Sequence, residues 1–305
     1  MQSQRRVTAL AEGALLASLT AILVLIGYFF PPLQLLTTVV WSVPILVLIV
    51  RRDLRLGLMA TFIAGLLILI FIGPVSAVLL FTQFAPLGIV YGYLFKHKTG
   101  AGKTVAAGSA VSLAALLINF YLGFLLTGLP LGGMVQELEN SMHHVLDFYQ
   151  RTGMLDSLTS RGLTVEQVQQ AMLDTLNTLK ILLPGILISA SLLAAFVNYV
   201  VAEKILQRLQ LMEGGLPPFR HWQLPWYFVW VVIAGLLCWQ LGDYAGIAIV
   251  SQVGLNLLYI TIPLLVGNGL AAVSFFFNRF KLAPFAKWAV AAIFLFYLPV
   301  ALVFI

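Results

Sequence analysis

Hydrophobic residues occur along the chain in long runs, which short polar and basic segments separate. Nine runs are long enough to be membrane helices, and Glu12 is the one formal charge within them. A bilayer core about 30 Å thick requires roughly 20 apolar helical residues to cross it. The predicted spans are residues 7–29, 33–50, 56–72, 75–95, 104–127, 181–202, 225–241, 247–278 and 288–305. The pattern therefore predicts an all-α polytopic membrane protein of about nine transmembrane helices, with eight as the alternative.

The run 247–278 decides how many helices are counted in the last part of the chain. It is too long for one upright helix and too short for two. Pro263 and the Gly267-Asn268-Gly269 segment are residues at which a helix breaks or bends. We interpret the run as one tilted or kinked helix.

The positions of the basic residues predict the orientation of the chain. Of 17 Lys and Arg residues, 14 precede the first span or follow the second, fourth, sixth and eighth spans. Positively charged loops are retained in the cytoplasm, so the N-terminus is predicted to be cytoplasmic. The net charge of +6 then reflects topology and contact with anionic lipid head groups, with no nucleic acid partner.

Composition strengthens the membrane assignment. Hydrophobic residues make up 61% of the 305 positions and charged residues 9%, with a mean hydropathy of +1.01. These values are typical of a multi-pass integral membrane protein and exclude a soluble domain. The single cysteine, Cys238, lies in an apolar run, so it forms no intrachain disulfide and is interpreted as a small buried hydrophobe.

The predicted domain organisation has three parts. Residues 1–202 form a six-span unit, which includes an outer segment, 128–180, with two amphipathic helices. Thr164 and Gln167 have the spacing of a capping box at the start of the second of these helices. The outer segment either covers an opening between the membrane helices or packs on lipid head groups. A cytoplasmic loop, 203–224, and three additional spans in 225–305 complete the chain.

Several short motifs imitate catalytic or metal sites without meeting their requirements. The segment Gly100–Thr104 ends like a phosphate-binding loop, but the first glycine of that motif would fall at His97. One histidine of the pair His143 and His144 can share a helical face with Asp147, which gives two ligands at most. Two ligands are too few for a metal site. No span carries a pair of carboxylates for acid–base chemistry. The sequence therefore predicts a protein that is not an enzyme and holds no cofactor or metal.

Uncharged polar and aromatic residues inside the spans are the candidates for solute binding. The predicted ligand-binding residues are Trp41, Gln83, Asn119 and Tyr121. Gln83, Asn119 and Tyr121 fall in the outward halves of their helices, where a solute from outside would meet them. The alternative is that the amides form hydrogen bonds between helices, because buried amides in lipid need partners.

Small residues at four-residue spacing form ladders on three of the predicted helices. Ala9, Gly13, Ala17 and Ala21 form a stripe on the first helix, with Glu12 beside it. Gly88 and Gly92 form a second ladder, and Ala106, Ala110 and Ala114 form a third. Such residues let two helix backbones approach closely, so the first stripe is predicted to dock on a partner.

Two resemblances add to this reading. The run RRVTALAEGALLASLTAILVLIG resembles the first helix of the substrate-binding subunits of energy-coupling-factor vitamin transporters. The resemblance implies that the face at Ala17 and Ala21 docks on a transmembrane coupling subunit, and it covers at most residues 1–202. Over nearly its full length the chain resembles the YybS-like family of bacterial membrane proteins, through VPILVLIVRRDLRLG, the Gly73-Pro74 turn and PLGIVYGYLFK. This resemblance implies a multi-pass protein of the bacterial inner membrane.

Two functional hypotheses follow from these features. The first is a solute-binding membrane component of a transport system, whose partner contacts the first helix and whose solute is unknown. The second is a membrane scaffold or regulatory protein that binds other proteins and no solute.

Overall fold

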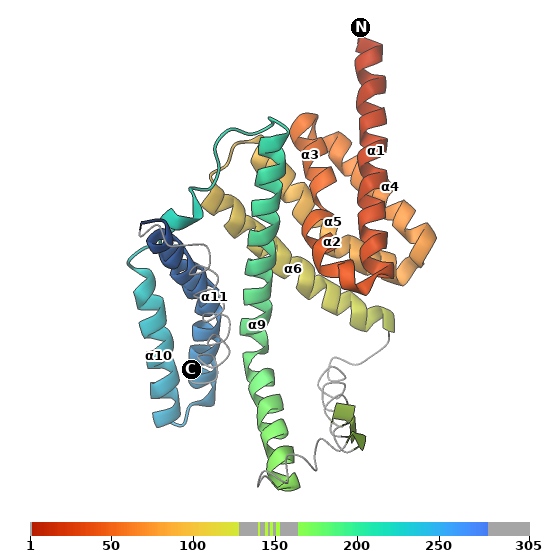
Figure 1. Ribbon diagram of the computed structural model, residues 1–305. Coiled ribbons are helices and arrows are strands. Elements are labelled where there is room, and N and C mark those ends of the chain that lie inside the picture. Colours follow the sequence, from red (N-terminus) through yellow and green to blue (C-terminus); the bar gives the residue numbers. More distant parts are fainter. Residues whose placement is uncertain are drawn as a thin grey trace.

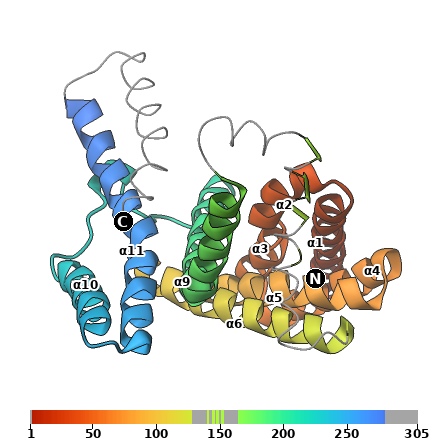
Figure 2. The ribbon, with the colours of Figure 1, turned by 90° about the horizontal axis from the view of Figure 1, so that it is seen from below.

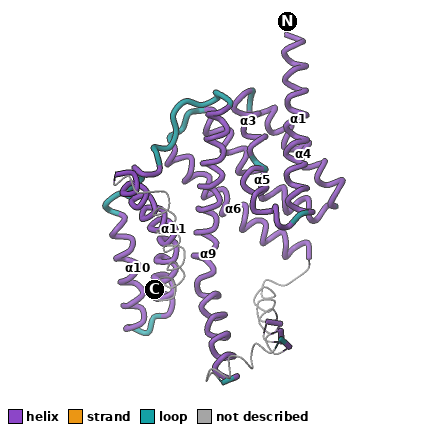
Figure 3. The backbone as a smooth tube through the Cα atoms, in the orientation of Figure 1, coloured by secondary structure: helices purple, strands orange, loops and turns teal. Residues whose placement is uncertain are grey.

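The computed structural model describes residues 2–127, 140, 144–145, 147–148, 151–152 and 164–279. Regular structure in these residues is helical throughout, which confirms the all-α prediction (Figures 1 and 3). The helices are α1 (Gln2–Phe29), α2 (Gln34–Val40), α3 (Val43–Arg51), α4 (Leu54–Ile72), α5 (Pro74–Lys96), α6 (Ala101–Thr127), α9 (Val165–Arg208), α10 (Phe228–Tyr244) and α11 (Ala248–Arg279). Two 3₁₀ turns, η1 (Pro31–Leu33) and η2 (Phe219–His221), precede α2 and α10.

Seven helical segments of the described chain are long and apolar enough to cross a membrane, and α10 is a shorter apolar helix of 17 residues. These eight segments correspond to the first eight predicted spans. The predicted span 288–305 and most of the first outer amphipathic helix lie outside the described residues.

The long helix α9 stands between two groups of helices. Helices α1 to α5 lie on one side of it, and the hairpin of α10 and α11 lies on the other (Figures 1 and 2). Helix α6 slants past the first group and packs against both α5 and α9. The C-terminal hairpin therefore reaches the six-span unit through α9.

The second predicted span, 33–50, is not one continuous helix. It consists of Leu33, α2 and α3, and the two helices are separated at Trp41 and Ser42, whose backbones keep helical dihedral angles. Pro44 lies in the first turn of α3, where the absence of its N–H costs least. The proline explains why the expected span is divided near its middle.

Glycines bring neighbouring helices into close contact at several points. Gly92 of the predicted Gly88–Gly92 ladder lies against Ile49 of α3, so this ladder is used inside the protein. In the C-terminal hairpin, a Cβ atom on Gly242 would lie 2.3 Å from the backbone nitrogen of Ser251. A Cβ atom on Gly254 would lie equally close to the backbone nitrogen of Trp239. Helices α10 and α11 therefore pack backbone to backbone.

Helix α9 has 44 residues and is about 66 Å long at 1.5 Å per residue, so it extends well beyond one bilayer core. Its first turn has the predicted capping box, in which Thr164 Oγ1 accepts from the Gln167 backbone and Gln167 Oε1 accepts from the Thr164 backbone. The helix continues to Arg208, six residues past the expected end of the six-span unit. The predicted single helix over 247–278 is also confirmed, as α11 with Pro263 inside it.

Candidate functional site

The small-residue stripe of α1 is buried against the protein's own helices. Ala17 is 0% exposed and packs with Ile45 and Leu48 of α3 and Ala60 of α4. Gly13 contacts Leu56, and Ala21 packs in a separate cluster that includes Trp41 and Phe84. Ala9 is half-buried. The prediction that this stripe presents a free face to a partner is therefore wrong for this structure, because the bundle's own packing occupies it.

The ladder on α6 has the opposite environment. Ala106, Ala110 and Ala114 are all exposed. They lie on the side of α6 that faces away from α5 and α9, since residues such as Gly108 and Ala115 fill those contacts. The ladders on α1 and α6 thus have the same residue spacing, but the first is mostly buried and the second is exposed.

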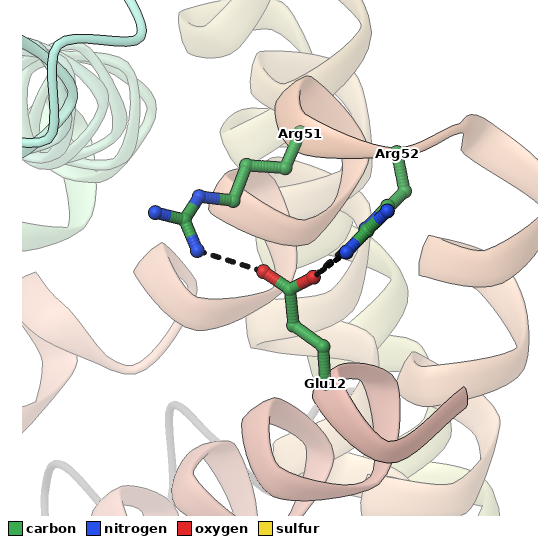
Figure 4. Close-up of polar contacts among 3 residues, drawn as sticks. All are labelled: Glu12, Arg51 and Arg52. Atoms are coloured by element: carbon green, nitrogen blue, oxygen red, sulfur yellow. Dashed lines mark hydrogen bonds and ion pairs between the residues drawn. The ribbon is translucent and has the colours of Figure 1, made fainter. Parts of the chain in front are cut away.

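Glu12, beside the buried stripe, pairs with two arginines at the end of α3 (Figure 4). Its carboxylate oxygens lie 2.8 Å from Arg51 Nη1 and 2.7 Å from Arg52 Nη2. Lys96 Nζ donates to the Arg52 carbonyl at the same end of the bundle. The basic ends of α3 and α5 therefore meet beside the N-terminal part of α1, on the side that the charge pattern predicts to be cytoplasmic.

The predicted solute residues do not converge on one point. Trp41 is buried against Phe84, with ring centroids 6.0 Å apart. Gln83 is exposed, and Tyr121 is 61% exposed. Asn119 Nδ2 donates to the Leu79 carbonyl and to Thr82 Oγ1, so it links α6 to α5. The structure thus favours the alternative of interhelical bonding for Asn119.

Polar groups do gather elsewhere, where α9 meets the break between α2 and α3. We call this set the α9 seam; its residues are Ser42, Tyr91, Ser191, Asn198 and Tyr199. All five side chains are buried. Ser42 Oγ donates to Asn198 Oδ1 at 3.2 Å, while Asn198 Nδ2 donates to the Ala194 carbonyl at 2.9 Å.

Tyr91 joins three helices within the seam. Its hydroxyl donates to the Ala195 carbonyl of α9 at 2.6 Å. Gly108 of α6 lies directly against that hydroxyl, because a Cβ atom there would be 2.2 Å from it. The Tyr91 and Tyr199 rings meet edge to face, with centroids 6.2 Å apart. Around Tyr91 the seam is therefore tightly packed, and the Tyr91 hydroxyl has its hydrogen-bond partner.

The part of the seam nearer the start of α9 differs in its hydrogen bonding. Ser191 lies on the same face of α9 as Ala195 and Asn198, because the residues are separated by four and seven positions. Among the described residues, Ser189 and Ser191 have buried hydroxyl oxygens with no hydrogen-bond partner. The two hydroxyls lie about 200° apart around the helix, so Ser191 belongs to the seam and Ser189 to another face.

The sequence contained only weak signals for the seam. Pro44, inside an otherwise continuous apolar run, was the sign that a span is broken. Ser191 and Tyr199 look like ordinary residues of a membrane helix, and their position opposite Ser42 depends on tertiary packing.

The remaining motifs behave as structural elements. Thr104 Oγ1 donates to the Gly100 carbonyl at the start of α6, and the segment follows helix α5 instead of a strand. Within the part of the chain that the structure describes, no group of three or more His, Cys, Asp and Glu residues gathers. His143 lies outside that part.

Comparisons with known proteins give the relationship of the whole chain. The family model described as predicted membrane protein (DUF2232) matches residues 18–305. The chain is 23% identical over 221 residues to Uncharacterized protein YybS of Bacillus subtilis (strain 168), covering 72% of this chain and 69% of that protein. No solved structure matches the chain. The resemblance to a YybS-like family is thus confirmed, while the resemblance to vitamin-transporter subunits stays a prediction.

Proposed function

The chain belongs to the DUF2232 family of predicted membrane proteins, and from that premise we propose that it is the solute-binding component of a transport system in the bacterial inner membrane. The proposal places the solute at the α9 seam, in contact with Ser191 and the break at Ser42. It assigns the protein no catalytic role.

The observation that carries the proposal is the broken second span. Ser42 lies nine residues before Arg51, so it is about 14 Å from the basic end of α3 and near the middle of a 30 Å bilayer core. Membrane helices interrupted at this depth recur in transporter binding sites, where freed backbone groups can bind the solute. At Trp41 and Ser42 the backbone angles stay helical, and the interruption comes from the N–H that Pro44 lacks. Here the break faces Asn198 of α9 through a direct hydrogen bond.

The hydroxyl of Ser191 supports the same location. The residue is 2% exposed, and a buried polar group without a partner costs about 1–3 kcal/mol. Ser191 lies two helical turns outward of Asn198, and α2 and α9 pack against each other in this part of the fold. A solute with a hydrogen-bonding group would satisfy this hydroxyl from the predicted outer side.

The chemistry of the seam limits the class of solute. The five residues contribute hydroxyl groups, one amide and two aromatic rings, and none carries a formal charge at neutral pH. At Ser191 a charged solute would have to lose its hydration without gaining a counter-ion from these five residues, at a large cost. The buried carboxylate of Glu203 interacts with Tyr199, but it lies twelve positions, about 18 Å, further along α9 than Ser191. The proposal therefore specifies a small uncharged solute with hydrogen-bonding groups.

The partner in this proposal has no assigned contact surface. The stripe at Ala17 and Ala21 is excluded from that role because it is buried within the bundle.

Native mass spectrometry of the gently purified full chain tests the function. A small molecule released together with the folded protein is the expected result. A retained protein without any small molecule would instead support the scaffold hypothesis, in which the seam is only a structural contact.

A further inference from the structure

A second polar contact lies at the interface between α9 and the C-terminal hairpin. Asn256 of α11 binds the backbone of α9 on both sides of Pro184. Its Oδ1 accepts from the Gly185 N–H at 2.7 Å, and its Nδ2 donates to the Ile181 carbonyl at 2.8 Å. The contact therefore involves a single side chain and one turn of the neighbouring helix.

The two backbone groups form a matched pair. In a regular α-helix the N–H of residue 185 donates to the carbonyl of residue 181. Pro184 supplies no N–H, and its ring disturbs the preceding turn, so a helix is easily bent at this point. Prolines are tolerated in membrane helices when a neighbouring side chain binds the disturbed backbone groups, which is what Asn256 does here.

Gly185 is required for this close approach. A Cβ atom at position 185 would lie 2.8 Å from Asn256 Oδ1 and 3.2 Å from the Asn256 carbonyl oxygen. Any larger residue would push α11 away from α9. Gly185 and Asn256 are thus fitted to each other across the interface.

Ser189 lies one turn further along the same face of α9 as Gly185. Its hydroxyl is buried and has no hydrogen-bond partner. The same face of α9 therefore carries a second buried polar group, one turn from the Asn256 contact.

We propose that Asn256 is a hinge lock: it fixes the direction in which the outer arm of α9, residues 165–181, leaves the membrane unit. The C-terminal hairpin is then a control element for the outer arm as well as a set of additional spans. Release of the Asn256 contact lets the arm turn about Pro184 while the part of α9 in the seam stays in place. This inference does not depend on whether the seam binds a solute.

Spin-label distance measurements test the lock in the full chain. Cys238 is the only cysteine, so a Cys238→Ala background accepts labels at Ala171→Cys on the outer arm and Val75→Cys on α5. Both positions are exposed. In lipid nanodiscs this reference protein should give a narrow distance distribution. Asn256→Ala should broaden and shift it.

A matched control uses another asparagine of the same helix. Asn268 Oδ1 accepts from the Leu224 N–H, away from the hinge. Asn268→Ala should leave the distance distribution unchanged. Gly185→Ala displaces Asn256 without changing the sequence of α11 and should broaden the distribution as Asn256→Ala does, which covers the case in which Asn256→Ala fails to fold.

A double substitution separates a lock from a general packing role. Pro184→Ala restores an N–H and removes the ring, so the Gly185 N–H and the Ile181 carbonyl can bond directly. Adding Pro184→Ala to Asn256→Ala should therefore return the narrow distribution. The proposal is overturned by unchanged distances in both single variants, by broadening in Asn268→Ala, or by failure of Pro184→Ala to restore the reference.

Discussion

Small side chains show how strongly one residue's role depends on what packs against it. Ala17 on α1 and Ala110 on α6 belong to ladders of the same spacing. Ala17 is enclosed by Ile45, Leu48 and Ala60, whereas Ala110 is exposed. A larger side chain is therefore expected to destabilise the protein at Ala17 and to have little effect at Ala110.

Ala17→Leu should lower the free energy of unfolding by about 1–3 kcal/mol, because three additional carbons must enter a packed core. Ala110→Leu, the same substitution on an exposed face, should leave stability within about 0.5 kcal/mol of wild type. Thermal unfolding of the purified variants in lipid nanodiscs measures both effects. Equal stability of the two variants would show that the α1 stripe is not core.

At the scale of helices, asparagine side chains join neighbouring elements. Asn119 links α6 to α5, Asn198 links α9 to Ser42, and Asn256 links α11 to α9. Each amide binds a backbone or hydroxyl group that lipid would leave unsatisfied. Interhelical polar contacts of this kind typically contribute about 0.6 kcal/mol and up to about 1.7 kcal/mol.

Asn119→Leu should therefore destabilise the protein by about 1 kcal/mol, since both hydrogen bonds to α5 are lost. Gln83→Leu is the control, because Gln83 is an exposed amide on α5 and its loss should have little effect. Chemical or thermal unfolding measures the difference. Loss of solute binding by Asn119→Leu at wild-type stability would restore Asn119 to the binding site.

The elements also show what the sequence can and cannot predict. The positions of the first eight spans and the Thr164 cap depend on local patterns, namely runs of apolar residues and one capping spacing, and these predictions are confirmed. The burial of Ala17 and the pairing of Ser42 with Asn198 depend on contacts between helices far apart in the chain. A hydrophobic pattern that is nearly uniform around each helix does not distinguish the lipid face from the core face.

At the scale of the whole molecule, basic residues gather at one end of the bundle. Arg51, Arg52 and Lys96 meet beside Glu12 at one end. The pattern of basic loops predicts that this end is cytoplasmic.

Reporter fusions test this orientation directly. A reporter after Leu155 should be active outside the cytoplasm, while reporters after Gly100 and Gly214 should be active inside it. Alkaline phosphatase and fluorescent-protein fusions at each site provide the two readouts. A cytoplasmic signal at Leu155 would reverse the direction from which a solute reaches the seam.

The central claim is that the α9 seam binds a solute through Ser191. The most direct measurement is native mass spectrometry of Ser191→Ala together with its thermal stability, with Ser109→Ala as the control because the Ser109 hydroxyl already donates to the Val105 carbonyl. We expect Ser191→Ala to lose the small molecule that wild type and Ser109→Ala retain. The ligand-free variant should be about 1 kcal/mol more stable than ligand-free wild type, since an unpartnered hydroxyl is removed. Undiminished retention of the small molecule by Ser191→Ala would contradict the account.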